Sequence, residues 1–428
     1  MTARRLHLSQ RSQRTTESPI NHFMQQAVEN ANLISLAAGL VDGDSLPAQD
    51  MAACVGEIFA RPDGGRSALQ YGTTAGYAPL RERVCQLVAR LDGVPANNFG
   101  IRPEQVVVTT GSQQMLHLLA EVLLDPGDIV VTEAPSYFVQ HGVLASHGAN
   151  VFAVPMDEEG METSALENFL LHLKGTGHLE RLKLIYLCDY FQNPTGLTLS
   201  VERRRHLLEL VRRFSVHNRI VVLEDAAYRE LGFNEKSLPS VLSFDREQQH
   251  VVYAGTFSKP CAPGLKTGYA LLPQDLVEPV LRFKGLHDFG SGNFNQHILE
   301  RFLVSGAYDR HVVELRQVYH AKKEAMLLAL DEEFADWPEV GWTDPQGGMF
   351  VWLSLPEDVD TGPGTPLLQA ALEEGMLYVP GEFCHVPDVN GNVPTNEMRL
   401  CYGVEPPERI HEAIRRLRRA TRAVLAMV

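Results

Sequence analysis

The segment VVYAGTFSKPCAPGLKTGYALL, residues 251–272, contains two short apolar runs joined by a turn rich in Gly, Pro, Ser and Thr. Apolar runs bounded by such turn residues are typical of β-strands. Because the connection is too short for a helical crossover, we expect at least one antiparallel neighbour here in the sheet. The turn places Lys259 between two strands, and a lysine in that position requires an explanation.

Five more apolar runs of this kind precede the segment. They alternate with patterns such as GSQQMLHLLAEVLL and SVERRRHLLELVRRF, in which apolar residues recur at helical spacing. Alternating strands and helices are typical of βαβ units, so the sequence predicts an α/β fold with a mainly parallel sheet covered by helices on both faces. The five runs lie at 106–109, 129–133, 151–154, 184–188 and 220–224.

From about residue 300 the pattern changes. Helical segments lead to the short runs GGMFVWLSL, GMLYVP and MRLCYG, and then to a basic amphipathic helix, ERIHEAIRRLRRATRAV. This order predicts a smaller α+β domain. We therefore expect an N-terminal arm and helix over 1–45 that pack with the small domain, a large domain over 46–300 and the small domain over 301–428.

Composition excludes several classes of protein. The 53 acidic residues exceed the 38 Lys and Arg residues, and the formal charge of -15 argues against a nucleic-acid binder. The six cysteines form no CxxC pairs, so we expect no disulfide framework, no metal site and a reducing, cytoplasmic setting. No apolar run reaches the about 18 residues that a membrane helix needs, so no membrane association is expected.

The first residues, MTARRLHLSQRSQRTTESP, are rich in Arg and Ser and contain no acid before Glu17. Organelle transit peptides share this composition. We favour a solvated arm, and a targeting role stays open.

Polar residues follow four of the apolar runs, where ligands of open α/β sheets bind. Gly111, Ser112 and Gln113 open a helix after the first run, and free N–H groups there can hold an anion, although a structural N-cap is the simpler alternative. Asn193 begins the turn NPTG after the run at 184–188, and it is equally compatible with a plain tight turn.

The other two strand ends carry a carboxylate and an amine. Asp225 ends a strongly apolar strand and needs a cation or hydrogen-bond donors, which an ordinary core ion pair would also supply. Lys259 can act as a nucleophile only if burial or a neighbouring cation such as Lys266 lowers its pKa. Together the four ends supply the amine, the acid and the phosphate cup that pyridoxal phosphate requires.

A family resemblance supports this combination. In order along residues 30 to 420, the motifs resemble those of class I/II aminotransferases of the fold-type I pyridoxal-phosphate superfamily, and most closely the α-aminoadipate aminotransferase-like subgroup. The resemblance implies a mainly parallel seven-stranded sheet flanked by helices, a smaller α+β domain and a homodimer with shared active sites. The motifs are QYGTTAGYAPLR, TTGSQQ, FQNPTG, EDAAY, TFSKPCAPGLKTGY, PQGGMFVW and MRLCYG.

The resemblance also implies roles for residues around the cofactor. Lys259 matches the lysine that binds pyridoxal phosphate covalently and then moves protons, and Asp225 matches the acid beside the pyridinium nitrogen. Asn193 and Tyr228 match the partners of the phenolic oxygen, and Tyr137 matches the aromatic residue that stacks on the ring. The phosphate is implied to contact Gly111, Ser112, Gln113, Thr256, Ser258 and Lys266.

Three further residues match positions at the substrate or the subunit boundary. Arg399 matches the arginine that binds the substrate α-carboxylate, helped by the backbone of Gly39 and by Asn193. Tyr71 matches a tyrosine that reaches the phosphate in the neighbouring subunit. Many members of the family have arginine at the position of Lys266. The compact ammonium group of lysine here replaces a planar guanidinium that can make two parallel hydrogen bonds.

The resemblance implies transfer of an amino group from an L-amino acid to a 2-oxo acid, with 2-oxoglutarate the expected acceptor, by a ping-pong mechanism. A lyase or an aminocyclopropane-carboxylate-synthase-like enzyme would use the same residues, and a non-catalytic regulator is a further alternative. In SPINHFMQQ, Asn21, His22 and Phe23 carry no permanent positive charge, so an obligatory acidic donor is not supported.

Overall fold

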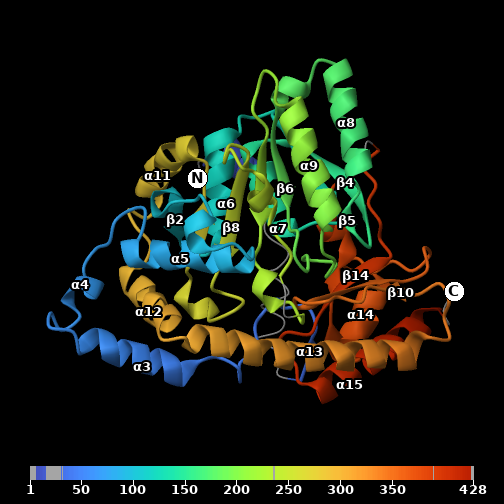
Figure 1. Ribbon diagram of the computed structural model, residues 1–428. Coiled ribbons are helices and arrows are strands. Elements are labelled where there is room, and N and C mark those ends of the chain that lie inside the picture. Colours follow the sequence, from blue (N-terminus) through green and yellow to red (C-terminus); the bar gives the residue numbers. More distant parts are fainter. Residues whose placement is uncertain (1–5, 16–29, 31, 235–236, 389, 426–428) are drawn as a thin grey trace, which may run out of the picture.

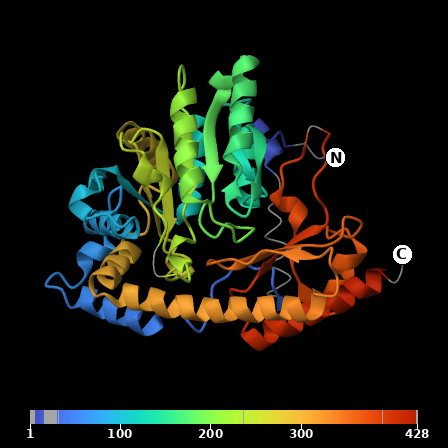
Figure 2. The same ribbon diagram turned by 45° about the vertical axis from the view of Figure 1, so that its right-hand side comes forward.

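The computed structural model describes residues 6–15, 30, 32–234, 237–388 and 390–425. A large α/β part and a smaller α+β part lie side by side above the long helix α13 (Ala307–Phe334), which runs beneath both of them (Figures 1 and 2). The active-site candidates lie where the two parts meet.

The large part is built on an eight-stranded sheet of order β2-β9-β8-β7-β6-β3-β4-β5. Neighbours from β8 through β4 are parallel, whereas β9 runs antiparallel to both β8 and β2. The expected strands are present, and β9 is the expected antiparallel neighbour. The strands are β2 (Val106–Thr109), β3 (Ile129–Ala134), β4 (Asn150–Asp157), β5 (Gly160–Met161), β6 (Leu182–Leu187), β7 (Val221–Asp225), β8 (Val251–Thr256) and β9 (Gly268–Leu271).

The strand count differs from the expected seven because of β5. This strand adds two residues at one edge, antiparallel to β4. Two residues are too few to show an alternating pattern, so the sequence contains no signal for this strand.

Helices cover both faces of this sheet, and the strand side chains alternate between them. On β7, Val221 and Leu223 join the core beneath α6, α7 and α11, whereas Val222 joins the core beneath α5, α8, α9 and α12. Helices α3 and α4 lie at one edge of the molecule (Figure 1), and the short helix α10 packs against α9 and β8. The helices are α3 (Ala48–Phe59), α4 (Arg66–Leu69), α5 (Ala78–Leu91), α6 (Ser112–Leu123), α7 (Phe138–His147), α8 (Thr163–Gly175), α9 (Val201–Phe214), α10 (Val241–Phe244), α11 (Gln274–His287) and α12 (Asn293–Val304).

The small part contains a four-stranded antiparallel sheet of order β10-β11-β14-β13, which shares one hydrophobic core with α13, α14 and α15. Strand β1 (Ile34–Ser35) pairs with β12 (Met376–Leu377), so the segment after the arm lies with the small part. The division at residues 45 and 300 stays a prediction from the sequence. The other elements are β10 (Gly341–Trp342), β11 (Phe350–Ser354), β13 (Val379–Pro380), β14 (Glu397–Cys401), α14 (Pro366–Glu373) and α15 (Pro407–Leu425).

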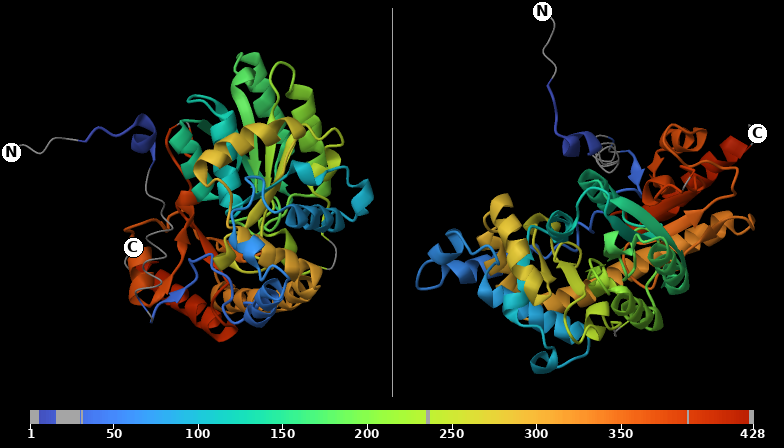
Figure 3. Two further views of the ribbon diagram at one scale, coloured as in Figure 1. Left: turned by 90° about the vertical axis from the view of Figure 1, so that its left-hand side faces the viewer. Right: turned by 90° about the horizontal axis from the view of Figure 1, so that it is seen from above.

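The described portion of the N-terminal arm forms the short helix α1 (Gln10–Arg14), dark blue in Figure 3. It lies at the edge of the molecule and contacts α7, and Arg11 pairs with Glu121 of α6 at 2.8 Å. This portion therefore contacts the large part, whereas the sequence predicted a solvated arm that packs with the small domain. Within the described ranges, no helix is both long and apolar enough to cross a membrane.

Candidate active site

A cavity of about 230 Å³ lies at the carboxyl ends of β6, β7 and β8, next to the start of α6. It brings together every residue singled out from the sequence except Gly39, Tyr71 and Arg399. A larger cavity of about 330 Å³, which Tyr190, Arg229 and Arg316 help to line, contains none of them. The smaller cavity is lined by Thr110, Gly111, Ser112, Gln113, Tyr137, Cys188, Asn193, Asp225, Ala227, Tyr228, Thr256, Ser258, Lys259, Pro263 and Lys266.

One end of the cavity has the features of an anion cradle. Gly111 precedes α6 with φ 71°, a conformation that suits glycine, and Ser112 is the first residue of the helix. Gly268 makes the close approach possible, since a Cβ added to it would lie 2.5 Å from the backbone nitrogen of Ser112. The open N–H groups of a helix start attract negative charge.

Hydroxyl groups and a cation complete this end of the cavity. The Oγ1 of Thr256 lies 3.0 Å from the Oγ of Ser258, and both residues line the cavity. Lys266 adds a positive charge from a left-handed turn position with φ 46°. Backbone donors, hydroxyls and an ammonium group at one place suit a phosphate.

Lys259 follows β8 and points toward the small part of the molecule. Its Nζ donates a hydrogen bond of 2.6 Å to the main-chain carbonyl of Gly39. Burial lowers the pKa of Lys259 to about 8; Arg399 and Lys266 act in the same direction, and Cys401 opposes them. The amine therefore loses its proton far more readily than a solvated lysine does, as a nucleophile must.

Asp225 ends β7 and is buried. Its Oδ2 accepts a hydrogen bond of 3.0 Å from the hydroxyl of Tyr186, whereas Oδ1 has no hydrogen-bond partner among the described residues. Burial raises the pKa of Asp225 to about 7, and the Tyr186 hydrogen bond opposes the rise. An unpaired, buried carboxylate oxygen lining a cavity fits a ligand that offers an N–H donor, as the pyridinium of pyridoxal phosphate does.

Arg399 extends from β14 of the small part and is only 1% exposed. Its Nη1 donates to Oδ1 of Asn193 and its Nη2 to the carbonyl of Ala37, each at 2.7 Å. The guanidinium lies 4.5 Å from the ring centre of Phe350. No carboxylate pairs with it in the part of the chain that the structure describes, and its Nε has no hydrogen-bond partner there, so this buried cation is suited to an anionic ligand.

Two tyrosines line the cavity walls. Tyr137 lies with its hydroxyl 3.5 Å from Oε1 of Gln113, and Tyr228 packs edge-on against Phe350 with ring centres 5.5 Å apart. Burial raises the pKa of both hydroxyls, which therefore stay protonated at neutral pH and can donate hydrogen bonds.

Two of the residues expected at the site, Gly39 and Tyr71, do not line the cavity. Gly39 reaches the site only through its carbonyl, and Tyr71 is 84% exposed, with its ring 5.9 Å from that of Phe289. Asn21, His22 and Phe23 lie outside the described residues.

Sequence reasoning missed several groups at this site. Thr110, Cys188, Ala227 and Pro263 also line the cavity. Cys188 follows β6 directly, so its position at a strand end was a usable signal. The carbonyl of Ala37 carries no side-chain signal at all.

The lowered pKa of the amine, the unpaired carboxylate oxygen and the anion cradle, placed at the ends of parallel strands, define a pyridoxal-phosphate enzyme of fold type I. The family model for aminotransferase class I and II matches residues 31–417. The chain belongs to this family, and it is a pyridoxal-phosphate-dependent aminotransferase.

Named relatives agree with this assignment. The chain is 35% identical to Aromatic-amino-acid aminotransferase 1 of Thermococcus litoralis over 91% of its length and 88% of that protein. It is 37% identical to 2-aminoadipate transaminase of Thermus thermophilus over 94% of its length and 93% of that protein. The crystal structure of Pyrococcus horikoshii kynurenine aminotransferase with PMP aligns with TM-score 0.88 and 33% identity, covering 98% of this chain and 97% of that one.

Proposed function

We propose that this protein moves the amino group of an L-amino acid to a 2-oxo acid, with 2-oxoglutarate as acceptor, in two half-reactions at one site. The observation that carries the proposal is the buried cation of Arg399, which is hydrogen-bonded to Asn193 in the wall of the cavity that Lys259 and Asp225 also line. Amino acids and 2-oxo acids share one feature, an α-carboxylate, and Arg399 can bind it in both half-reactions.

Each residue then has a role at a stated atom. Bound pyridoxal phosphate supplies an electron sink for the bonds of the substrate Cα. Lys259 would hold the cofactor through its amine and then move the proton at Cα, while Asp225 would keep the proton on the ring nitrogen. Asn193 and Tyr228 would hold the phenolic oxygen, and Tyr137 would pack on the ring.

Separate residues would hold the two anions. Arg399, assisted by the backbone of Gly39, would hold the α-carboxylate of the substrate. The phosphate of the cofactor would be held by Gly111, Ser112, Gln113, Thr256, Ser258 and Lys266.

A single-turnover experiment separates the proposal from the alternatives. Holoenzyme is mixed with one amino donor at a time, including an aromatic, an acidic and an aliphatic amino acid. Stoichiometric 2-oxo acid and the amine form of the cofactor support transfer, and 2-oxoglutarate should then restore the starting spectrum. Ammonia with pyruvate would instead show an eliminating lyase, and no change with any donor would favour a non-catalytic binder.

We further propose a homodimer in which Tyr71 completes the neighbouring site. Tyr71 lies outside the cavity of its own chain, and its ring contacts that of Phe289. Leu69, Leu286 and Phe289 are 63%, 87% and 62% exposed. A second copy would cover this patch. The free, buried cysteines support the cytoplasmic setting expected from the sequence.

Mixed dimers test the sharing of sites. Lys259→Ala and Tyr71→Ala chains are each impaired alone, and after subunit exchange one site of the mixed dimer regains both residues if Tyr71 acts across the interface. Recovery of activity on mixing supports the shared site, whereas no recovery in verified mixed dimers contradicts it.

A further inference from the structure

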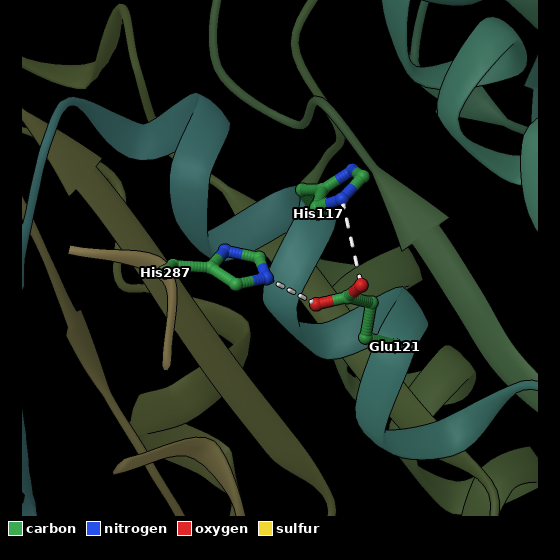
Figure 4. A group of neighbouring side chains, drawn as sticks. All are labelled: His117, Glu121 and His287. Atoms are coloured by element: carbon green, nitrogen blue, oxygen red, sulfur yellow. Dashed lines mark ion pairs between the residues drawn. The ribbon is translucent and has the colours of Figure 1, made fainter. Parts of the chain in front are cut away.

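Two imidazoles and one carboxylate form a cluster on α6 and α11, apart from the residues proposed to act in amino transfer. His117 and Glu121 are one turn apart on α6, and His287 ends α11. One ligand atom from each lies within 4.8 Å of the others, and Figure 4 shows both imidazoles beside the Glu121 carboxylate. None of the three lines the active-site cavity.

The distances within the cluster are close to those between ligands of one ion. Nε2 of His287 lies 2.7 Å from Oε2 of Glu121, and Nε2 of His117 lies 3.8 Å from Oε1. The side chains of His117, Glu121 and His287 are 34%, 11% and 30% exposed, so an ion can reach them from solvent. Two imidazoles with one carboxylate are a ligand set typical of zinc.

His147, at the end of α7, is a third imidazole at this place. Its Nδ1 lies 2.9 Å from the carbonyl of Val143, so the Nδ1 proton is donated there and Nε2 carries the free lone pair.

Arg11 of α1 occupies the approach to these ligands. One atom, Nη2, lies 2.9 Å from Nε2 of His117 and 3.0 Å from Nε2 of His147, while Nη1 donates to Glu121 at 2.8 Å. A guanidinium and a divalent cation would compete for the same lone pairs and repel each other. Arg14 also connects α1 to the large part, because its Nε donates a hydrogen bond of 3.4 Å to the carbonyl of Ser146.

We propose that His117, Glu121 and His287 form a site for a divalent transition metal ion, with Zn²⁺ as the preferred ion, and that Arg11 competes with the metal for it. When Arg11 leaves, His147 becomes available as a fourth ligand. Metal binding therefore releases α1 from the large part, and docking of α1 weakens metal binding by the same factor.

Zn²⁺ competition with a chromogenic chelator, carried out on the full-length holoenzyme, tests the site. One Zn²⁺ per chain is expected, and His117→Ala, His287→Ala and the shape-conserving Glu121→Gln should each weaken binding by about tenfold or more. The matched control is His320→Ala, because His320 and Glu324 form an exposed pair at the same spacing without a third ligand. Absence of stoichiometric Zn²⁺, or equal weakening in His117→Ala and His320→Ala, would overturn the site.

The competition is tested separately. Arg11→Ala should tighten Zn²⁺ binding, whereas Arg14→Ala, on the same helix but outside the cluster, should have a smaller effect. In the wild type, Zn²⁺ should also speed tryptic cleavage at Arg11 and Arg14, and this response should be lost in His117→Ala. Unchanged Zn²⁺ affinity in Arg11→Ala would overturn the competition.

Discussion

Nη1 of Arg399 donates a hydrogen bond of 2.7 Å to Oδ1 of Asn193, and this bond connects a strand of the small part with the strand ends of the large part. The two residues are 206 positions apart in the chain. Because both face the same site, a ligand that binds Arg399 also touches the boundary between the two parts. Substrate binding and the relative position of the two parts are therefore expected to be coupled.

Arg399→Lys should lower kcat/KM for both the amino donor and the 2-oxo acid by about 10- to 100-fold, because lysine cannot make two parallel hydrogen bonds to a carboxylate. The cofactor spectrum should stay unchanged, since Arg399 does not line the cofactor cavity. Steady-state kinetics with both substrates measure the effect. Arg418→Lys is the control, since this buried arginine pairs with Asp336; equal losses in both variants would contradict the role of Arg399.

The rate at which cofactor-free protein attaches pyridoxal phosphate should rise with pH and level off above about 8. Only the neutral amine reacts, and the pKa of Lys259 is lowered to about 8, chiefly by burial. Attachment is measured by absorbance and by borohydride trapping, which Lys259→Arg should abolish. Lys266→Ala removes a neighbouring positive charge and should shift the midpoint upward, whereas a wild-type midpoint near 10 would contradict the lowered pKa.

Asp225 should make the stability of cofactor-free protein fall as pH rises from about 4 to about 7. Burial raises the pKa of Asp225 from 3.8 to about 7, so the folded state binds more protons than the unfolded state in this window. Stability decreases with rising pH by about 1.4 kcal/mol per pH unit at most and is constant above the window. Asp225→Asn lacks this dependence.

Unfolding by denaturant at several pH values measures the difference between wild type and Asp225→Asn. Taking the difference removes the contribution of other buried acids, such as Glu133, whose pKa burial raises to about 8. The asparagine variant should gain relative stability up to about pH 7. A difference that does not vary with pH would show that Asp225 is ionised throughout.

The parts of this site that the sequence predicted share one property: they follow apolar runs. Lys259, Asp225 and Asn193 are visible because strand ends of a parallel sheet meet at one edge, so chain order alone brings them together. The same alternation of strands and helices predicted the sheet and its antiparallel strand β9.

Other contacts depend on tertiary packing that no local pattern records. Tyr186 donates to Asp225 from the neighbouring strand β6, and its sequence position is that of an ordinary core residue. Arg11 meets His117 and His147 across 106 and 136 residues, so the docking of α1 has no signal in the arm itself. The carbonyls of Ala37 and Gly39 act through the main chain and are independent of residue type.

Gly268→Ala should weaken both the fold and the retention of pyridoxal phosphate. The new Cβ would lie 2.5 Å from the nitrogen of Ser112 and 2.6 Å from the carbonyl carbon of Gly111; both are backbone atoms that cannot rotate away. We expect a loss of about 1–3 kcal/mol in unfolding free energy and faster release of the cofactor, measured by denaturant titration and by dialysis. Gly142→Ala is the control, because no atom lies within 4 Å of its added Cβ and alanine favours the interior of α7 by about 0.5–1 kcal/mol. Similar cofactor retention in the two variants would show that the cradle tolerates a wider separation between β9 and α6.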